Sequence, residues 1–567
     1  MNRIWLVGPC VLLLLAACAP PPSPAPTPAP TASPTFTPPQ AEATTAADHA
    51  ALPLPVEQRE LFTTSGTCAA CHTDMGDEAG NDVSTDAFWR ASMMANAARD
   101  PYWQASVRGE VISTPDYQAV IEDKCATCHM PMARFTATTT GQEGKVFGDG
   151  FLHPESELHT LALDGVSCNL CHQIRAVGFG EFASFSGGYV IDTELPAGRR
   201  LAYGPYPVGK NPARIMQSAS GFIPIQSLHV ERSELCATCH TLYTPYVDAT
   251  GRIAGNFPEQ TPYLEWIQSD YLDSRSCQDC HMPPAEGGVR LSTTGGPLRS
   301  PFYQHVFVGG NAYMLEVLST FGEDLAVTAS QEQFADKAAR VADQLQNRTA
   351  TVALAQANLS EADLKASVVV KSQVGHKFPS GFPARRVWLH FTVRDAEGRV
   401  IFESGSVNSD GAIAGNDNDA DPTAYEPHYL TIHRPDEVQI YEAIMHDPEG
   451  DVTTILLRSA GYIKDNRLLP SGFDKRRAHD DIAVRGLALA DEDFLGGGDK
   501  IEYAVHVGDA QGPFTVTVEL LYQSIAYRWA DNLRRYDSAE SARFVSYYET
   551  LPNRPVVVAS ETIEVEK

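Results

Sequence analysis

One short pattern, Cys-x-x-Cys-His, recurs five times in this chain of 567 residues. Two thiols three positions apart on a helical turn reach both vinyl groups of a porphyrin, and the histidine that follows points at the iron. The repeats therefore predict five covalently attached c-type haems. The attaching cysteines are Cys68, Cys71, Cys125, Cys128, Cys168, Cys171, Cys236, Cys239, Cys277 and Cys280. The proximal iron ligands are His72, His129, His172, His240 and His281.

Two other uses of paired cysteines explain the pattern less well. A redox-active Cys-x-x-Cys would account for one copy, but not for five copies that are each followed by histidine. Structural zinc would combine two motifs into a site of four ligands, and five motifs leave an odd copy and unused histidines. Haem attachment uses every cysteine and histidine of the repeats.

Each proximal histidine leaves one axial position on its iron open. Five further histidines stand in loop-like or glycine-flanked sequence, which equals the number of motifs. These expected distal ligands are His153, His159, His229, His305 and His376. Methionine competes with them, because Met93 or Met94 could ligate an iron and raise the potential of that haem. The alternative is that both methionines pack a helix against a porphyrin face.

Three further segments are distinctive. Cys-His-Met-Pro occurs at 128–131 and again at 280–283, Val-Phe-Val-Gly-Gly follows His305, and His376 stands in Gly-His-Lys-Phe-Pro-Ser-Gly. Together with the haem motifs, these segments resemble multihaem cytochromes c of the cytochrome c-552/c-554 type, over about residues 60–395. The resemblance implies that His305 and His376 are distal ligands, and relatives often carry histidine where Met93 or Met94 stands.

The N-terminus is typical of an export signal. Arg3 precedes an apolar run that is too short to span a bilayer and ends in Leu-Ala-Ala-Cys. This ending resembles the bacterial lipobox, which implies a signal peptide at 1–17 and a lipid anchor on Cys18; the alternative is an ordinary signal peptide with an incidental cysteine. Residues 18–55, rich in Pro, Ala and Thr, are expected to form the tether of a membrane-anchored lipoprotein on the periplasmic or extracellular face.

The rest of the chain predicts an α+β protein. Residues 56–325 are expected to form a pentahaem domain of short helices and haem-wrapping loops, because the motifs follow one another closely. A helical connector is expected at 326–365, where Ser330 begins a capping box and Phe334, Ala338, Val341 and Leu345 follow at helical spacing. Alternating apolar residues at 387–393, 501–507 and 514–520 predict an antiparallel β-sandwich over 366–567.

The expected sandwich contains no cysteine, but its first loop holds His376. We therefore expect it to reach back and ligate a haem, with Lys377, Arg385 or Arg386 available to neutralise propionates. The other histidines of this part are interpreted as structural: His390, His428, His433, His446, His479 and His506.

One loop of the expected sandwich is rich in oxygen ligands. Asp410 and the run Asn416, Asp417, Asn418, Asp419 and Asp421 provide the hard donors that Ca²⁺ prefers, although the spacing is not that of an EF-hand. A Ca²⁺ site and a polar loop held by Asx turns remain alternatives.

The net charge of the chain and its number of candidate distal histidines limit the functions that fit the sequence. A formal charge of −28 argues against a nucleic-acid binder, because phosphate recognition needs a basic face. The matching number of histidines favours electron transfer between membrane-side donors and periplasmic or extracellular acceptors, with redox proteins, metal ions or minerals as partners. The alternatives are a multihaem oxidoreductase that acts on a small nitrogen or sulfur compound at a five-coordinate haem, and a sandwich that binds a partner or carbohydrate.

Overall fold

The structure is a computed structural model that describes residues 49–566. The expected signal peptide, the expected lipidation of Cys18 and most of the tether lie outside the described residues, so they stay predictions. Within the described range, no helix combines the length and the apolar character needed to cross a bilayer.

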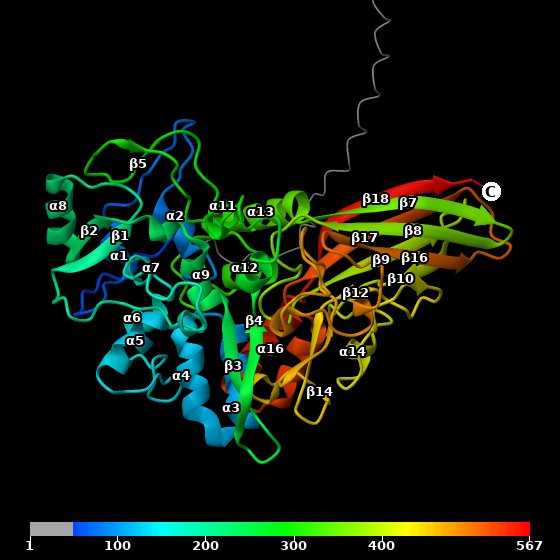
Figure 1. Ribbon diagram of the computed structural model, residues 1–567, viewed down its shortest axis with the longest axis horizontal. Coiled ribbons are helices and arrows are strands. Elements are labelled where there is room, and N and C mark those ends of the chain that lie inside the picture. Colours follow the sequence, from blue (N-terminus) through cyan, green and yellow to red (C-terminus); the bar gives the residue numbers. More distant parts are fainter. Residues whose placement is uncertain (1–48, 567) are drawn as a thin grey trace, which may run out of the picture. The chain divides into compact units, whose positions relative to one another are not determined.

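Each Cys-x-x-Cys-His motif begins or ends on a short helix (Figure 1). These helices are α1 (Ser65–Ala69), α4 (Gln118–His129), α7 (Cys168–Cys171), α9 (Ser233–His240) and α11 (Cys277–His281). The segments between them form α2 (Thr85–Arg90), α3 (Pro101–Ser113), α5 (Pro131–Thr139), α6 (His159–Leu163), α8 (Lys210–Ser220) and α10 (Pro262–Trp266). Three strand pairs complete this part: β1 (Arg200–Gly204) with β2 (Phe222–Gln226), β3 (Leu242–Val247) with β4 (Ile253–Gln260), and β5 (Val289–Arg290) with β6 (Leu298–Arg299).

Two helices lead from the haem motifs to the sheets. After α12 (Ala312–Thr320), α13 (Gln331–Arg348) begins at the expected capping box of Ser330 and Gln333. The predicted register is nearly right, because Phe334, Val341 and Leu345 are buried. Lys337 is buried in place of the expected Ala338, which is exposed.

Two larger sheets follow. The first orders β10 (Val400–Ser404), β9 (Arg386–Arg394), β17 (Phe514–Gln523) and β18 (Val556–Val565), and β12 (Ile440–Tyr441) also pairs with β9. The second orders β11 (Thr431–Ile432), β16 (Gly498–His506), β8 (Asp363–Ser372) and β7 (Ala350–Ser360). The three alternating runs are confirmed as β9, β16 and β17, and the expected α+β class is confirmed. A smaller sheet orders β14 (Val452–Thr453), β13 (Ala443–His446) and β15 (Gly461–Asp465).

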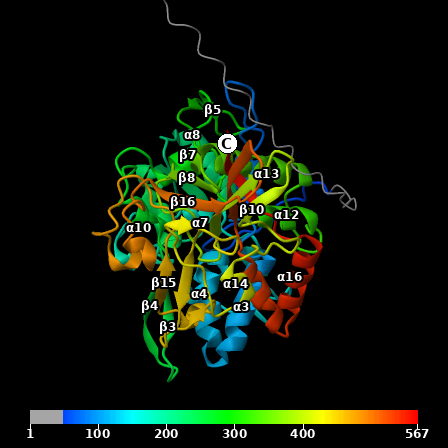
Figure 2. The same cartoon turned by 90° about the vertical axis from the view of Figure 1, so that its right-hand side faces the viewer.

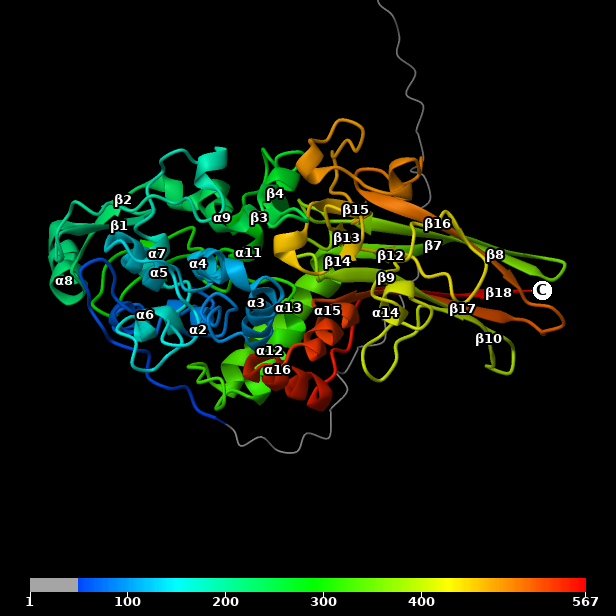
Figure 3. The ribbon, with the colours of Figure 1, turned by 90° about the horizontal axis from the view of Figure 1, so that it is seen from below.

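The two larger sheets form layers that pack face to face, as Figure 3 shows from below. The ring of Phe391 on β9 stacks on Tyr503 of β16 with centroids 3.9 Å apart.

Two details of the sheets differ from the expectation. Strand β11 pairs parallel with β16, so the second sheet is not wholly antiparallel. Strand β7 begins at Ala350, inside the expected connector. Alanine at two exposed positions, Ala353 and Ala355, and a bulge after Leu354 hide its alternation in the sequence.

The C-terminal helix α16 (Ala539–Thr550) packs against α3 of the haem-motif part (Figure 2). Arg108 on α3 donates two hydrogen bonds to Glu540, at 3.1 and 3.0 Å. A Cβ atom at Gly109 would lie 2.7 Å from the ring of Tyr536, so glycine permits this close approach. One buried core therefore runs from the haem motifs into the sheets, within the single unit Asp48–Lys567.

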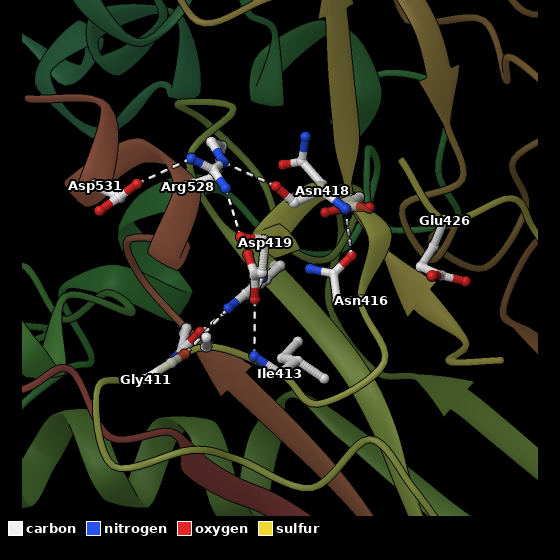
Figure 4. Close-up of polar contacts among 12 residues, drawn as sticks. Gly411, Ile413, Asn416, Asn418, Asp419, Glu426, Arg528 and Asp531 are labelled. Atoms are coloured by element: carbon white, nitrogen blue, oxygen red, sulfur yellow. Dashed lines mark hydrogen bonds and ion pairs between the residues drawn. The ribbon is translucent and has the colours of Figure 1, made fainter. Parts of the chain in front are cut away.

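Two arginines bind the acidic loop at Asn418 and Asp419. The Ca²⁺ site expected in this loop stays a prediction. Arg386 donates to both carboxylate oxygens of Asp419, at 2.8 and 2.9 Å. Arg528 donates to the backbone carbonyl of Asn418 at 2.8 Å and to that of Asp419 (Figure 4). The expected role of Arg386 beside a propionate is therefore wrong: the side chain is 1% exposed and is bound to Asp419.

Breaking this ion pair should destabilise the sheets. We expect Asp419→Asn to lower the free energy of unfolding by about 3 kcal/mol, because Arg386 is left buried without its counterion. Urea unfolding of the protein, followed by circular dichroism, measures the change. The matched variant Asp421→Asn alters an exposed residue of the same loop and should behave like the parent chain. Equal effects of the two substitutions would contradict this account.

Candidate functional site

The five motifs converge on one mostly apolar cavity of about 1240 Å³. All five motif histidines line it, as do all the motif cysteines except Cys71. Motifs that are separated by up to two hundred residues in the chain therefore share one wall. An apolar cavity bordered by paired thiols and imidazoles fits porphyrins, whose macrocycles are apolar and whose iron takes histidine nitrogen.

Four of the motif histidines are oriented in the same way. The Nδ1 atom donates to a backbone carbonyl: His72 to Leu291 at 2.7 Å, His129 to Ala97 at 3.0 Å, His172 to Tyr203 at 2.5 Å and His281 to Val308 at 2.5 Å. A carbonyl only accepts, so the proton is on Nδ1 and the lone pair of Nε2 is free for a metal. Burial lowers the pKa of His129 and of His281 to about 4, which keeps both rings neutral, as iron ligation requires.

Two pairs of histidine rings have the spacing of axial ligands. A metal–imidazole bond is about 2 Å long and the ring centre lies about 1.1 Å beyond the nitrogen, so rings on opposite sides of one metal have centres about 6.3 Å apart. The rings of His172 and His305 are 6.3 Å apart with planes 22° from parallel. Those of His281 and His376 are 6.2 Å apart at 11°. Aromatic rings also pack at such distances, but all four of these rings border the cavity.

The other expected distal ligands lie elsewhere. His153 is exposed, and its Nδ1 accepts from the N–H of Glu155. His159 shares a hydrogen bond of 3.0 Å with the carbonyl of Phe151. Both ring nitrogens of His229 are engaged, Nδ1 with Ser227 and Nε2 with the carbonyl of Ile174, each at 2.7 Å. None of these three histidines borders the cavity, whereas Met93 and Met94 both do.

Thiols of different motifs meet inside the cavity. Cys68 is a neighbour of Cys168, Cys128 of Cys239, and Cys236 of Cys277. The first motif is therefore beside the third, and the fourth is beside both the second and the fifth. This spatial order differs from the order along the chain.

A buried network of four charged residues holds the His376 loop. Lys377 follows His376, and its Nζ donates to Asp465 at 2.7 Å. Arg467 donates to Asp465 at 2.9 and 2.8 Å and pairs with Glu265 at 3.0 Å. Glu265 in turn accepts from the backbone N–H of Lys377 at 3.0 Å and from Ser380 at 2.8 Å. Because Glu265 is on α10 and Asp465 ends β15, the network joins the haem-motif part to the sheets.

The cationic residues of the cavity wall were only partly predicted. Of the three expected basic residues, Arg385 alone borders the cavity, since Lys377 and Arg386 are bound to Asp465 and Asp419. Lys337 also borders it and was missed. Its spacing from Phe334 and Val341 places it on the buried face of α13, which is the signal that could have identified it.

A second cluster of ligand-type residues is structural. His428, Asp491 and Asp499 converge in the sheets and are buried. The Nδ1 atom of His428 accepts from Gln439 at 2.8 Å and from Asn466 at 3.1 Å, so the proton is on Nε2 and donates to Asp491 at 2.9 Å. With Nε2 protonated, the ring offers no lone pair to a metal. The interpretation of His428 as structural agrees with this geometry.

Comparisons with known proteins give little further information. No protein-family model matches the chain. No curated protein matches its sequence. A solved penta-heme cytochrome c552 from Thermochromatium tepidum is similar at 15% sequence identity and a TM-score of 0.47, over 88% of this chain and 98% of that one. A likeness this distant shows neither the function nor the cofactor of this chain.

The charged network predicts a pH dependence of stability. Burial alone would raise the pKa of Asp465, but Arg467 and Lys377 outweigh it and hold this pKa well below its usual range. The unfolded chain, with an aspartate pKa of about 3.9, therefore takes up the proton first as the pH falls. The stabilisation is complete above about pH 5 and is lost below it, towards the lower pKa of the folded state.

Asp465→Asn should therefore lower the free energy of unfolding by about 3 kcal/mol at pH 7, and the difference from the parent chain should shrink as the pH falls from about 5 to 3. Urea unfolding at each pH measures it. Asp363→Asn, at an exposed aspartate, is the matched control and should stay near the parent throughout. A constant difference for Asp465→Asn would show that the network does not control this titration.

Proposed function

We propose that this chain is a pentahaem c-type cytochrome that transfers electrons among haems held in one cavity. The observation that carries the proposal is the convergence of five Cys-x-x-Cys-His motifs on that cavity, with four proximal rings turned by the same Nδ1 hydrogen bond. Bound haems would supply one-electron chemistry between Fe(III) and Fe(II).

In this proposal the chain supplies attachment, orientation and exclusion of water. The ten motif cysteines hold the porphyrins covalently, and the five motif histidines provide proximal nitrogen. His305 would fill the second axial position of the iron held by His172, and His376 that of the iron held by His281. The ring spacings of 6.3 and 6.2 Å support both assignments. The meeting thiols would place neighbouring porphyrin edges close together, with the fourth motif as the link between the second and the fifth.

The proposal gives the sheets a role in haem ligation. His376 stands between β8 and β9, and the buried charges of Glu265, Lys377, Asp465 and Arg467 fix the backbone beside it. The sheets therefore present a distal ligand to a haem that is attached about a hundred residues earlier. We further propose that Cys18 carries a lipid anchor and that the charge of −28 favours cationic redox partners, metal ions or minerals.

A second candidate function rests on the remaining ligand positions. In the described residues, paired rings at the axial spacing occur at two of the five motifs, those of His172 and His281. An open position at one of the other three irons would allow a small nitrogen or sulfur compound to bind, as in a multihaem oxidoreductase. A high-spin signal that disappears on addition of cyanide or nitric oxide would favour this candidate over pure electron transfer.

The distal ligands can be tested one at a time. We expect His305→Ala and His376→Ala each to convert one low-spin haem into a high-spin haem, because each removes one axial nitrogen and leaves the covalent attachment intact. Electron paramagnetic resonance of the oxidised protein measures this directly. His479→Ala alters an exposed histidine between β15 and β16 and should leave the spectrum unchanged. A parent-like low-spin spectrum in either variant would rule out that histidine as a ligand.

A further inference from the structure

We infer that Lys337 is a positioning residue that holds one short segment, residues 305–308, in the form that serves two haems at once. The inference rests on the ligation proposed above. At one end of the segment, the ring of His305 lies 6.3 Å from that of His172. At the other end, the carbonyl of Val308 accepts the Nδ1 hydrogen bond of His281 at 2.5 Å. The distal ligand of one haem and the carbonyl that orients the proximal ligand of another are thus three residues apart.

Lys337 reaches the middle of this segment from α13. Its Nζ donates to the carbonyl of Val306 and, at 2.9 Å, to that of Phe307. The side chain is 4% exposed and borders the cavity. A buried ammonium is tolerated only when its hydrogen bonds are made, so these two carbonyls and the lysine fix one another.

The backbone of the segment needs such support. Phe307 has a φ of 46°, in the left-handed region that glycine adopts readily and that is unfavourable for a residue with a large side chain. The Phe307 ring also packs edge-on against His305, with centroids 5.6 Å apart. Because both carbonyls that Lys337 binds belong to this strained turn, loss of the ammonium removes the contact that offsets the strain.

A shift of residues 305–308 would therefore change the ligand geometry at both haems. At the haem of His172, it would rotate the His305 ring away from the present 22° between the two ring planes. At the haem of His281, it would lengthen the hydrogen bond that fixes the proximal ring. A purely structural lysine would change stability without changing the ligand geometry of these two haems together.

The test uses Lys337→Met in the haem-loaded chain, which keeps the length of the side chain and removes the ammonium. The two signals are first assigned with His305→Ala and His376→Ala. Electron paramagnetic resonance then reports the g-values, which depend on the angle between the axial rings. We expect both assigned signals to shift and the other three to stay unchanged. At pH 6 and a fixed applied potential, the ratio of reduced to oxidised haem at His281 should fall roughly tenfold, which corresponds to about 59 mV for one electron, because the ammonium of Lys337 has been removed.

Lys475→Met is the matched control. Lys475 is also buried, and its Nζ also donates to two backbone carbonyls, those of Ala488 and Asp491, but it lies in the sheets away from the cavity. This variant should leave all haem signals as in the parent protein. If Lys337→Met does not load haem, Lys337→Gln, which is shorter and uncharged, is measured in its place and should shift the same two signals.

Three results would overturn the inference: unchanged g-values at both haems, a change at only one of them, or equal changes in Lys475→Met. These results remain distinct from failure of the ligation itself. If His305→Ala leaves its haem low-spin, the proposed ligand is wrong; if that haem becomes high-spin while Lys337→Met resembles the parent, only the positioning role is wrong.

Discussion

The hydrogen bond from Nδ1 of a motif histidine to a backbone carbonyl is the interaction on which the cavity depends. At four of the five motifs, those of His72, His129, His172 and His281, it fixes the tautomer, leaves Nε2 free for a metal and ties the motif to another part of the chain. For His72 the acceptor is Leu291, and for His281 it is Val308. The part that carries the five motifs is built from helices of four to thirteen residues, which position its histidines poorly by themselves. These hydrogen bonds provide the positioning.

Where the sheets border the cavity, buried ionic groups position the backbone beside His376. The four charges of Glu265, Lys377, Asp465 and Arg467 balance, and every one of them is hydrogen-bonded, which is the condition under which buried ions are tolerated. Removing any one of them would leave an uncompensated charge beside His376. The sheets thus contribute to the cavity through the loop of His376. In their own ligand-like cluster, amide donors occupy Nδ1 of His428.

Much of the architecture could be predicted from the sequence, because local patterns determine it. The motif spacing predicts short helices, the capping box at Ser330 locates α13, and alternating apolar residues locate β9, β16 and β17. Strand β7 could not be located in this way, since alanine on its exposed side and a bulge hide the alternation. The same limit applies to Lys337, where only the helical register distinguishes it from the exposed Ala338.

The ligand set shows where sequence reasoning stops. A count of histidines equal to the count of motifs suggested five distal ligands. Yet His153, His159 and His229 lie off the cavity, and among residues 49–566 axial spacing to a motif histidine is found for His305 and His376. Likewise, a pair of neighbouring arginines was expected to include a propionate partner. Neighbouring residues at a strand point to opposite sides, and here Arg385 faces the cavity while Arg386 binds Asp419.

The central claim, that one cavity holds five covalent haems, is tested most directly by the intact mass of the denatured protein. The protein would be produced in a host that matures c-type cytochromes and stripped of any non-covalent cofactor with acidified acetone before measurement. The account predicts a chain that carries the mass of five haems and an iron content of five per chain, matching its five motifs. Fewer than five attached haems, or a chain that contains zinc and no covalent porphyrin, would contradict it.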